Sequence, residues 1–267
     1  MTGAASTAPA MVAFAISGSI MRFPSLARRW LFVSLCCAGG CSTGEYQKDY
    51  DSRISAFREE SVFAVLATNP IPLGDGRVEL RTPRQLGPQQ DDDGAKIRAR
   101  PPFVKSFPGF SLSYEKQHLA GNAQLPVVLT LGVVPSSQQR FGEVEREILE
   151  QVRRDEAFPK AEWTKGKTVQ PAAGGPAIWD VLSLRGQQEF ESLVGGVPEY
   201  KKWAGVCEIW VSADPKQEFC TVLALRVPDD IAAQLELPPE QLAELVARTV
   251  RVLPPPDEPA ADAAVAK

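Results

Sequence analysis

The spacing of apolar and polar residues predicts a β-rich body between residues 102 and 253. Phe110–Tyr114 alternates with a period of two residues, which is typical of a half-buried strand. The continuous apolar run over 127–134 indicates a central strand that is buried on both faces. A turn signal at Asp214-Pro215 separates two further apolar runs and predicts the strongest hairpin. The surest strands are expected at 127–134, 178–184, 206–212 and 219–226, with another at 163–169.

Two amphipathic helices are expected against this sheet. Apolar residues recur at spacings of three and four over 139–154, and again over 240–250 after Pro238-Pro239. The strands are joined mostly by turns, with one helix inserted and one at the end. This order predicts an α+β fold, in which helices pack on an antiparallel sheet as a sandwich. The helix positions expected to face the sheet are Phe141, Val144, Ile148, Leu242, Leu245 and Val246.

Composition separates this body from the segments on either side. Residues 42–60 are polar and charged, as in a tether. Residues 68–102 are rich in proline and contain the acidic run 91–93, so we expect a loop or linker with at most a short strand at 78–81. Residues 254–267 are rich in proline and alanine and are expected to form a disordered tail.

The N-terminal region has the layout of a secretory signal. Arg28-Arg29 precede a short apolar run over 30–38, and small residues then lead to Cys41. The run is shorter than the roughly 20 residues that a membrane-spanning helix needs. The segment Ala38-Gly39-Gly40-Cys41 resembles the lipobox of a bacterial lipoprotein signal. This resemblance implies cleavage before Cys41 and a diacylglycerol on its thiol, which would fix the mature N-terminus to a membrane.

Cleavage before Cys41 changes the charge of the chain. It removes forty residues that carry three arginines and no acid, so the formal net charge falls from −4 to −7. An acidic chain argues against nucleic-acid binding, which depends on Lys and Arg at the phosphates. Residues 1–20 fit neither a signal sequence nor a domain, so Met21 reads as the better start. The expected divisions are a signal peptide at 1–40, a lipidated N-terminus with tether and linker at 41–101, a globular domain at 102–253 and the tail at 254–267.

The order of elements in the body resembles the PsbP-like fold, which is shared by a photosystem II extrinsic protein, a Ran-binding nuclear-transport factor and several bacterial lipoproteins. The resemblance rests on the strand ending at Val133-Val134-Pro135 before a helix, on the hairpin Cys207–Leu225 and on the last helix, Gln241–Thr249. It covers about the last three-fifths of the chain and implies a sandwich of sheet and helices. No motif within it is specific enough to transfer a functional residue, and a fold alone does not give a function.

Few residues of the body carry recognisable chemistry. His118 is the single histidine; its surroundings predict a solvated loop, and no Gly-x-Ser-x-Gly elbow accompanies it. Cys207 and Cys220 are thirteen positions apart, which matches no zinc-ligand spacing. No phosphate-binding glycine loop is present. We therefore expect no metal, no cofactor and no enzymatic activity.

Acidic residues and tryptophans are the remaining candidates for a site. Two carboxylates held a few ångströms apart could perform acid–base hydrolysis. Glu189 and Glu191 flank Phe190, and this alternation favours the solvated side of a half-buried strand instead. The tryptophans could line a ligand groove, but we prefer to place them in the core. The carboxylates are Asp180, Glu189, Glu191 and Glu208, and the tryptophans are Trp163, Trp179, Trp203 and Trp210.

The two cysteines of the body are expected to remain unpaired, although the expected compartment permits disulfides. If Cys207 and Phe219 both face the core, the alternation of a strand places Cys220 on the opposite face. In the other register, a turn centred between Asp214 and Pro215 sets the two cysteines diagonally across the hairpin, too far apart to bond. Only a slip of that turn would place them directly opposite each other.

Three functions remain open. The favoured one is a non-catalytic envelope lipoprotein whose domain binds or scaffolds another protein. A lipid on Cys41 would anchor it to a bacterial membrane, facing the periplasm or the exterior. The second is a small-molecule or lipid-binding module with a pocket between sheet and helices, and the third is a carboxylate-dependent hydrolase. The sequence does not identify the protein partner.

Overall fold

The computed structural model describes residues 61–89, 107–171 and 175–254, together with a few separate positions between 47 and 53. The expected signal segment, Cys41 and the tail after Pro254 lie outside the described residues.

The described part of the body is built on a seven-stranded antiparallel sheet in the order β3-β4-β5-β9-β8-β7-β6. Its strands are β3 (Gly87–Pro88), β4 (Phe110–Ala120), β5 (Ala123–Pro135), β6 (Thr164–Val169), β7 (Ala177–Val194), β8 (Val197–Ala213) and β9 (Phe219–Pro228). This confirms the antiparallel sheet and each of the strands expected from the sequence, although β7 and β8 are much longer than expected.

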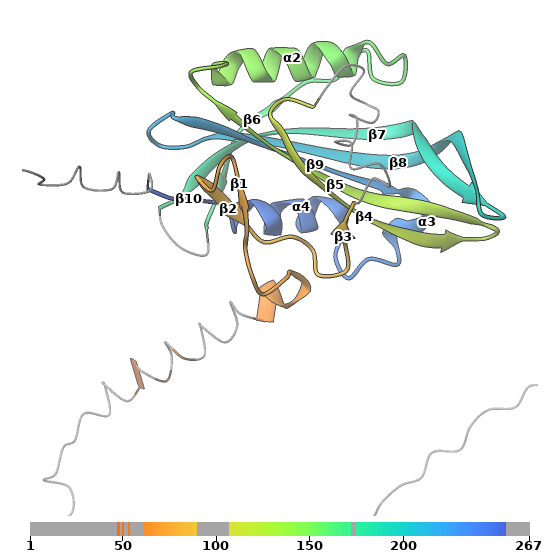
Figure 1. Ribbon diagram of the computed structural model, residues 1–267, viewed down its shortest axis with the longest axis horizontal. Coiled ribbons are helices and arrows are strands. Elements are labelled where there is room, and N and C mark those ends of the chain that lie inside the picture. The colour runs from red at the N-terminus through yellow and green to blue at the C-terminus, as the bar shows by residue number, and fades with distance from the viewer. Residues whose placement is uncertain are drawn as a thin grey trace, which may run out of the picture. The chain divides into compact units, whose positions relative to one another are not determined.

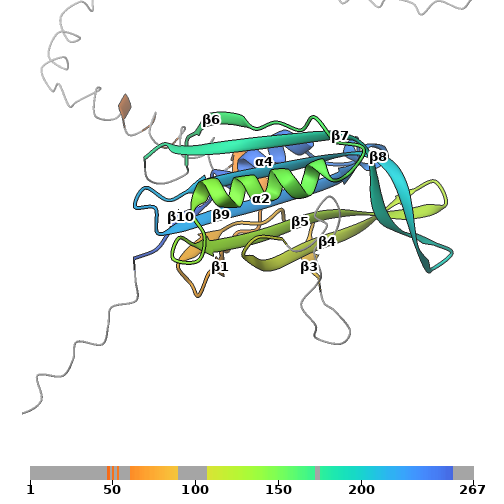
Figure 2. The same cartoon turned by 90° about the horizontal axis from the view of Figure 1, so that it is seen from above.

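Helices cover both faces of this sheet (Figure 1). α2 (Phe141–Arg153) lies on one face, and the view in Figure 2 shows it over the central strands β8 and β9. α4 (Pro239–Ala247) lies on the other face, beside the short α3 (Asp229–Ala232). A small sheet accompanies α4, formed by β1 (Ile71–Leu73), β2 (Val78–Leu80) and β10 (Arg251–Val252), with the 3-10 helix η1 (Phe63–Val65).

Each face of the large sheet has its own apolar core. Beneath α2, Val144, Ile148 and Val152 are fully buried against strand residues such as Ile209 and Val222. The core beneath α4 is larger. It contains the buried helix residues Leu242, Leu245 and Val246 and the strand residues Leu129, Trp210 and Leu225. Five of the six helix positions expected to face the sheet are buried, and Phe141 is half-buried against the α2 core.

The stretch expected to be a linker belongs partly to the core. Leu66, Leu73, Val78 and Leu80 are buried in the α4-side core, so the prediction of tether and linker over 41–101 is wrong for residues 61–89. The prolines of this stretch conceal its contribution to the core, because the short strands between them each bury only one or two residues. The small sheet brings these buried side chains together, and they extend the core beneath α4.

The hairpin β7–β8 extends beyond the end of its neighbour β9. Pro228, the last residue of β9, pairs with Gly205, and the hairpin continues for eight more residues of β8 to Val197. Near its tip it turns back to β5, where Ala123 pairs with Val194. Gly205 permits this curl, because a Cβ there would lie 2.8 Å from the Val227 carbonyl oxygen.

Candidate functional site

One edge of the sheet is open along the middle of β7. The hairpin closes through the two-residue turn Gly195-Gly196, so the flanking pair Val194–Val197 is the hydrogen-bonded closing pair. Hydrogen-bonded pairs alternate along an antiparallel ladder, so the even-numbered residues of β7 bond to β8. The odd-numbered residues therefore direct their backbone N–H and C=O groups toward the outer edge.

Contacts occupy this outer edge at both ends. At one end, Val181 is paired with Thr164 of β6. At the other end, Arg226 Nη2 donates a hydrogen bond of 2.5 Å to the carbonyl oxygen of Glu189. Beyond that point β5 takes over the edge, where it pairs with Leu193 and Val194.

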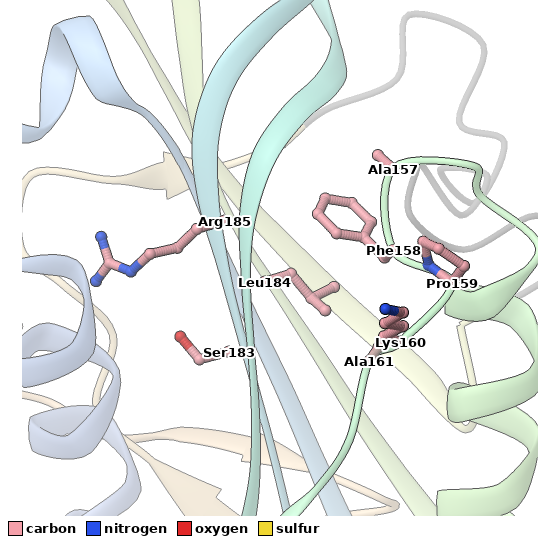
Figure 3. Close-up of a pocket in the computed structure, with 8 residues that line it drawn as sticks. All are labelled: Ala157, Phe158, Pro159, Lys160, Ala161, Ser183, Leu184 and Arg185. Carbon is pink, nitrogen blue, oxygen red and sulfur yellow. The ribbon is translucent and has the colours of Figure 1, made fainter.

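The stretch between these contacts is exposed. Within the described residues, no strand pairs with the outer edge of β7 between Ser183 and Gln187. A groove of about 330 Å³ lies beside it, between β7 and the loop that follows α2 (Figure 3). Leu184 points toward this loop, whereas Ser183 and Arg185 point away from it. The groove is lined by Ala157, Phe158, Pro159, Lys160, Ala161, Ser183, Leu184 and Arg185.

Polar contacts surround the α4 side of this edge. The hydroxyl of Ser183 donates a hydrogen bond to Glu208, which is 2 % exposed. Burial raises the pKa of Glu208 above its ordinary value, and the hydrogen bond from Ser183 opposes this shift. Arg185 lies 3.5 Å from the carboxylate of Glu240 on α4, and both side chains are about half exposed.

A second polar cluster ties α2 to the opposite face of the sheet. Lys165 of β6 bridges two buried carboxyls, Glu145 on α2 and Asp180 on β7, with its Nζ 3.1 Å from Asp180 Oδ2. The backbone N–H of Gly166 also donates to Asp180, at 2.7 Å. A shift of register between Thr164 and Lys167 places a bulge here, and Gly166 adopts the positive φ that it requires.

Burial and hydrogen bonding act in opposite directions on these two carboxyls. Burial raises the pKa of Glu145, and the ammonium of Lys165 only partly offsets the rise. Burial also acts to raise the pKa of Asp180, but hydrogen bonds from Glu145, Gly166 and Lys165 outweigh it and the pKa is lowered. The pKa of Lys165 is raised because its hydrogen bonds to both carboxyls exceed the effect of burial. The cluster therefore acts as an ionic link between helix and sheet.

The carboxylates considered as a hydrolytic set do not come together. Asp180 is opposite Val211 of β8, which belongs to the core beneath α2, so Asp180 lies on the α2 face. Glu208 is three positions before Val211 on β8, and an odd separation along a strand places it on the α4 face. Phe190 is 1 % exposed between the solvent-accessible Glu189 and Glu191. The alternation proposed for this strand is thus confirmed.

The tryptophans and the histidine have mainly structural settings. Trp179 and Trp210 are fully buried with ring centroids 6.2 Å apart, edge to face, which confirms the core interpretation for these two. Trp163 and Trp203 are half-buried. The prediction of a loop at His118 is wrong, because this residue lies in β4 opposite Leu125. Burial, followed by the charge of Lys116, lowers the pKa of His118.

The two cysteines are free, as expected, but for a different reason. They share the α2 face, and the hairpin register pairs Cys207 with Arg226 and Ala213 with Cys220. The carboxylate of Asp214 accepts the backbone N–H groups of Lys216 and Phe219, so the loop is longer than the two-residue turn on which the expectation rested. Burial raises the pKa of each thiol to about 12.

Neither a metal-ligand cluster nor a membrane-spanning helix occurs among the described residues. No group of three or more His, Cys, Asp or Glu side chains there could hold a metal ion. No described helix has the length and apolarity needed to cross a membrane.

The sequence indicated neither the groove nor the ionic cluster. Glu145 sits among other charged residues of the amphipathic helix, and Lys165 lies in a strand without clear alternation. A signal for the groove is also missing, because the loop residues that form it have no motif and the open edge depends on where β6 begins.

Comparison with known proteins gives only remote structural likeness. No protein-family model and no curated protein matches the chain. A point mutant of the protein Mog1 is 12% identical with a TM-score of 0.37, over 69% of this chain and 95% of that one. The Ran-binding protein Mog1p of Saccharomyces cerevisiae is 10% identical with a TM-score of 0.36, over 70% and 96%. A protein of Bacteroides thetaiotaomicron is 10% identical with a TM-score of 0.34, over 70% and 48%. These values assign neither a family nor a function.

Proposed function

We propose that this chain is a non-catalytic protein-binding domain, held at a bacterial membrane by a lipid on Cys41 and exposed to the cell envelope. The observation that carries the binding role is the groove of about 330 Å³ beside the open edge of β7. An unpaired strand edge is a template for pairing with another chain, and proteins usually cover or block such edges. Here the edge borders the groove, whose lining includes Ser183, Leu184 and Arg185 of β7.

The tether rests on the signal-like segment before Cys41. A single acyl chain gives only reversible membrane binding, so stable anchoring would need more than one chain on the processed N-terminus. We further propose that the sandwich is of the PsbP-like kind. The inserted helix before the long hairpin and the last helix on the other face support this assignment.

Binding of a protein is favoured over the two other functions by the distribution of side chains. Asp180 and Glu208 are separated by the sheet, so they cannot act on one bond as an acid–base pair. The space between the sheet and each of the two long helices is filled by the two apolar cores, whereas the groove opens at the sheet edge.

Two measurements test this proposal. Changing Cys41 to Ser should leave an unprocessed chain that takes up no radioactive palmitate, and labelling or trimming of this variant as in wild type would contradict the anchor. Chemical cross-linking in native membranes, followed by purification and mass spectrometry, should give one reproducible protein partner. If the chain is recovered without a stoichiometric partner under these conditions, the binding role is refuted.

A further inference from the structure

We infer that the open edge of β7 binds an extended segment of a partner protein, which adds to the sheet as a further strand and alternates acidic with apolar residues. This inference rests on the proposed function, because it specifies how the protein-binding groove is used. Strand addition provides affinity through main-chain hydrogen bonds, and side-chain pockets provide specificity.

The backbone of β7 has the geometry that this mode of binding requires. Ser183, Arg185 and Gln187 direct their N–H and C=O groups outward, and all three residues are exposed. At about 3.3 Å per residue, the stretch from Ser183 to Gln187 spans roughly 13 Å. Its ends are defined by the pairing of Val181 with β6 and by the contact of Arg226 with Glu189. An added strand would continue the line of β6 along the same edge.

Within the part of the chain that the structure describes, the hairpin has a second edge without a strand partner, and this edge differs in one respect. β9 pairs with β8 only from Gly205 onward, so β8 is not covered by β9 between Val197 and Ala204. The same alternation directs the backbone groups of Pro198 and Lys202 outward there. Proteins block exposed edges with proline and with charged side chains, lysine above all. Between Ser183 and Gln187, β7 has neither proline nor lysine, and Arg185 is its single charged residue, so this edge is less protected than that of β8.

The side chains around the groove indicate the chemistry of the segment. On the α2 side, Phe158 and Leu184 form a buried apolar floor. The two charged side chains that line the groove, Lys160 and Arg185, are both cationic. Arg185 contacts Glu240 at 3.5 Å but remains 61% exposed, so its guanidinium retains donors for a second carboxylate. A strand that places apolar side chains on the α2 side and acidic ones on the α4 side matches the floor of Phe158 and Leu184 and the guanidinium of Arg185.

A peptide probe tests this inference on the purified full chain in mild detergent. The probe is the fluorescein-labelled heptapeptide Thr-Val-Asp-Val-Asp-Val-Thr, measured by fluorescence anisotropy. Two matched peptides serve as controls: one with Lys in place of Asp, and one N-methylated at every peptide nitrogen, so that neither of its edges can donate a hydrogen bond to the strand. We expect binding of the acidic probe, with at least about ten-fold weaker binding of each control, the difference that loss of one or two hydrogen bonds or ion pairs gives. Equal binding of the N-methylated peptide would overturn strand addition, and equal binding of the lysine peptide would overturn the acidic preference.

Variants of the chain locate the site. Arg185→Pro removes an outward N–H and the cation, whereas Arg185→Gln removes only the cation. Lys202→Pro removes an outward N–H from the second edge and is the matched control. We expect Arg185→Pro to abolish binding, Arg185→Gln to weaken it and Lys202→Pro to leave it unchanged. Similar binding by the two proline variants would refute the site.

Amide hydrogen exchange of the wild-type chain keeps the test independent of how well the variants fold. Addition of the acidic probe should slow exchange at Ser183, Arg185 and Gln187 by at least about ten-fold and leave Lys202 unchanged. Absence of protection at the three β7 amides would overturn the inference. If the cross-linked partner is still recovered from native membranes, the proposed function stands and its binding surface lies elsewhere.

Discussion

Lys165 is the residue whose removal should most directly reveal the ionic link between α2 and the sheet. Replacing it with Met takes away the cation between Glu145 and Asp180. At the 3.1 Å that separates Lys165 from Asp180, two unit charges attract by about 5 kcal/mol with an effective dielectric constant of 20. The Lys165 side chain is 54% exposed, so solvent screens most of this attraction, and exposed pairs contribute about 0–1 kcal/mol each. We therefore expect a loss of about 1–2 kcal/mol at neutral pH.

The loss should depend on pH. Because the pKa of Glu145 is already raised, this group stabilises the folded chain below its ordinary pKa, and the contribution is lost as the pH rises through the raised value. Without Lys165, the pKa of Glu145 rises further. The lowered pKa of Asp180 stabilises the fold above its ordinary value, and part of this contribution disappears with the lysine. Both effects make the deficit larger at pH 7 than at about pH 4.

Urea denaturation at the two pH values measures this difference. The midpoint of the Lys165→Met variant should fall clearly below that of wild type at pH 7, and the gap should shrink by about half near pH 4. Arg146→Met is the control, since Arg146 is an exposed cation on the same helix and next to Glu145. An equal deficit at both pH values, or the same deficit in the control, would refute the ionic link.

Three further predictions test the fold. Ile148→Asp places a charge in the core beneath α2 and should abolish cooperative unfolding. The control Glu150→Ala, on the exposed face of the helix, should change stability by less than about 0.5 kcal/mol. Equal melting temperatures for the two variants would contradict the packing of α2. Glu208→Gln removes the cost of ionising a buried carboxyl whose pKa is raised. The substitution should therefore increase the melting temperature at pH 7 and have little effect at about pH 4. An increase at pH 4 only would contradict this reasoning. Gly205→Ala forces a Cβ against the Val227 carbonyl and should cost about 1–3 kcal/mol by urea denaturation, and an unchanged midpoint would show that the curled hairpin adjusts freely.

Much of the fold follows from hydrophobic pattern alone. The run that became β5 is apolar at nearly every position, as a strand covered on both faces must be, and the spacing in α2 leaves only one face apolar. Within the small sheet, the short strand expected at 78–81 is confirmed as β2, whereas β1 was missed. β1 is three residues long, which is too short for a periodic pattern to stand out against the prolines around it. The burial of both strands depends on the core beneath α4, which distant strands provide.

The hairpin register shows where local reasoning reaches its limit. The Asp214-Pro215 signal correctly predicts a turn, but the two carboxylate oxygens of Asp214 bond to Lys216 and Phe219 and extend the loop. A turn centred between Asp214 and Pro215 would pair Cys207 with Val222. In the structure Cys207 pairs with Arg226, four positions further along β9. Four is an even shift, so it does not change which residues of the two strands share a face. The faces instead differ from the preferred assignment because Leu223 and Leu225 pack beneath α4, on the side opposite Cys207.

The candidate site could not be predicted for a related reason. An open edge is a relation between two strands, and it arises here because the six residues of β6 cover only the beginning of the eighteen-residue β7. The residues from Ser183 to Gln187 pair continuously with β8, and their own sequence does not show that a neighbour is missing on the other side. The polar side chains that make this stretch resemble a solvent-exposed strand are compatible with strand addition, since the hydrogen bonds come from the backbone and not from the side chains. Residues of this kind reveal a binding surface only once the lengths of the strands on both sides are known.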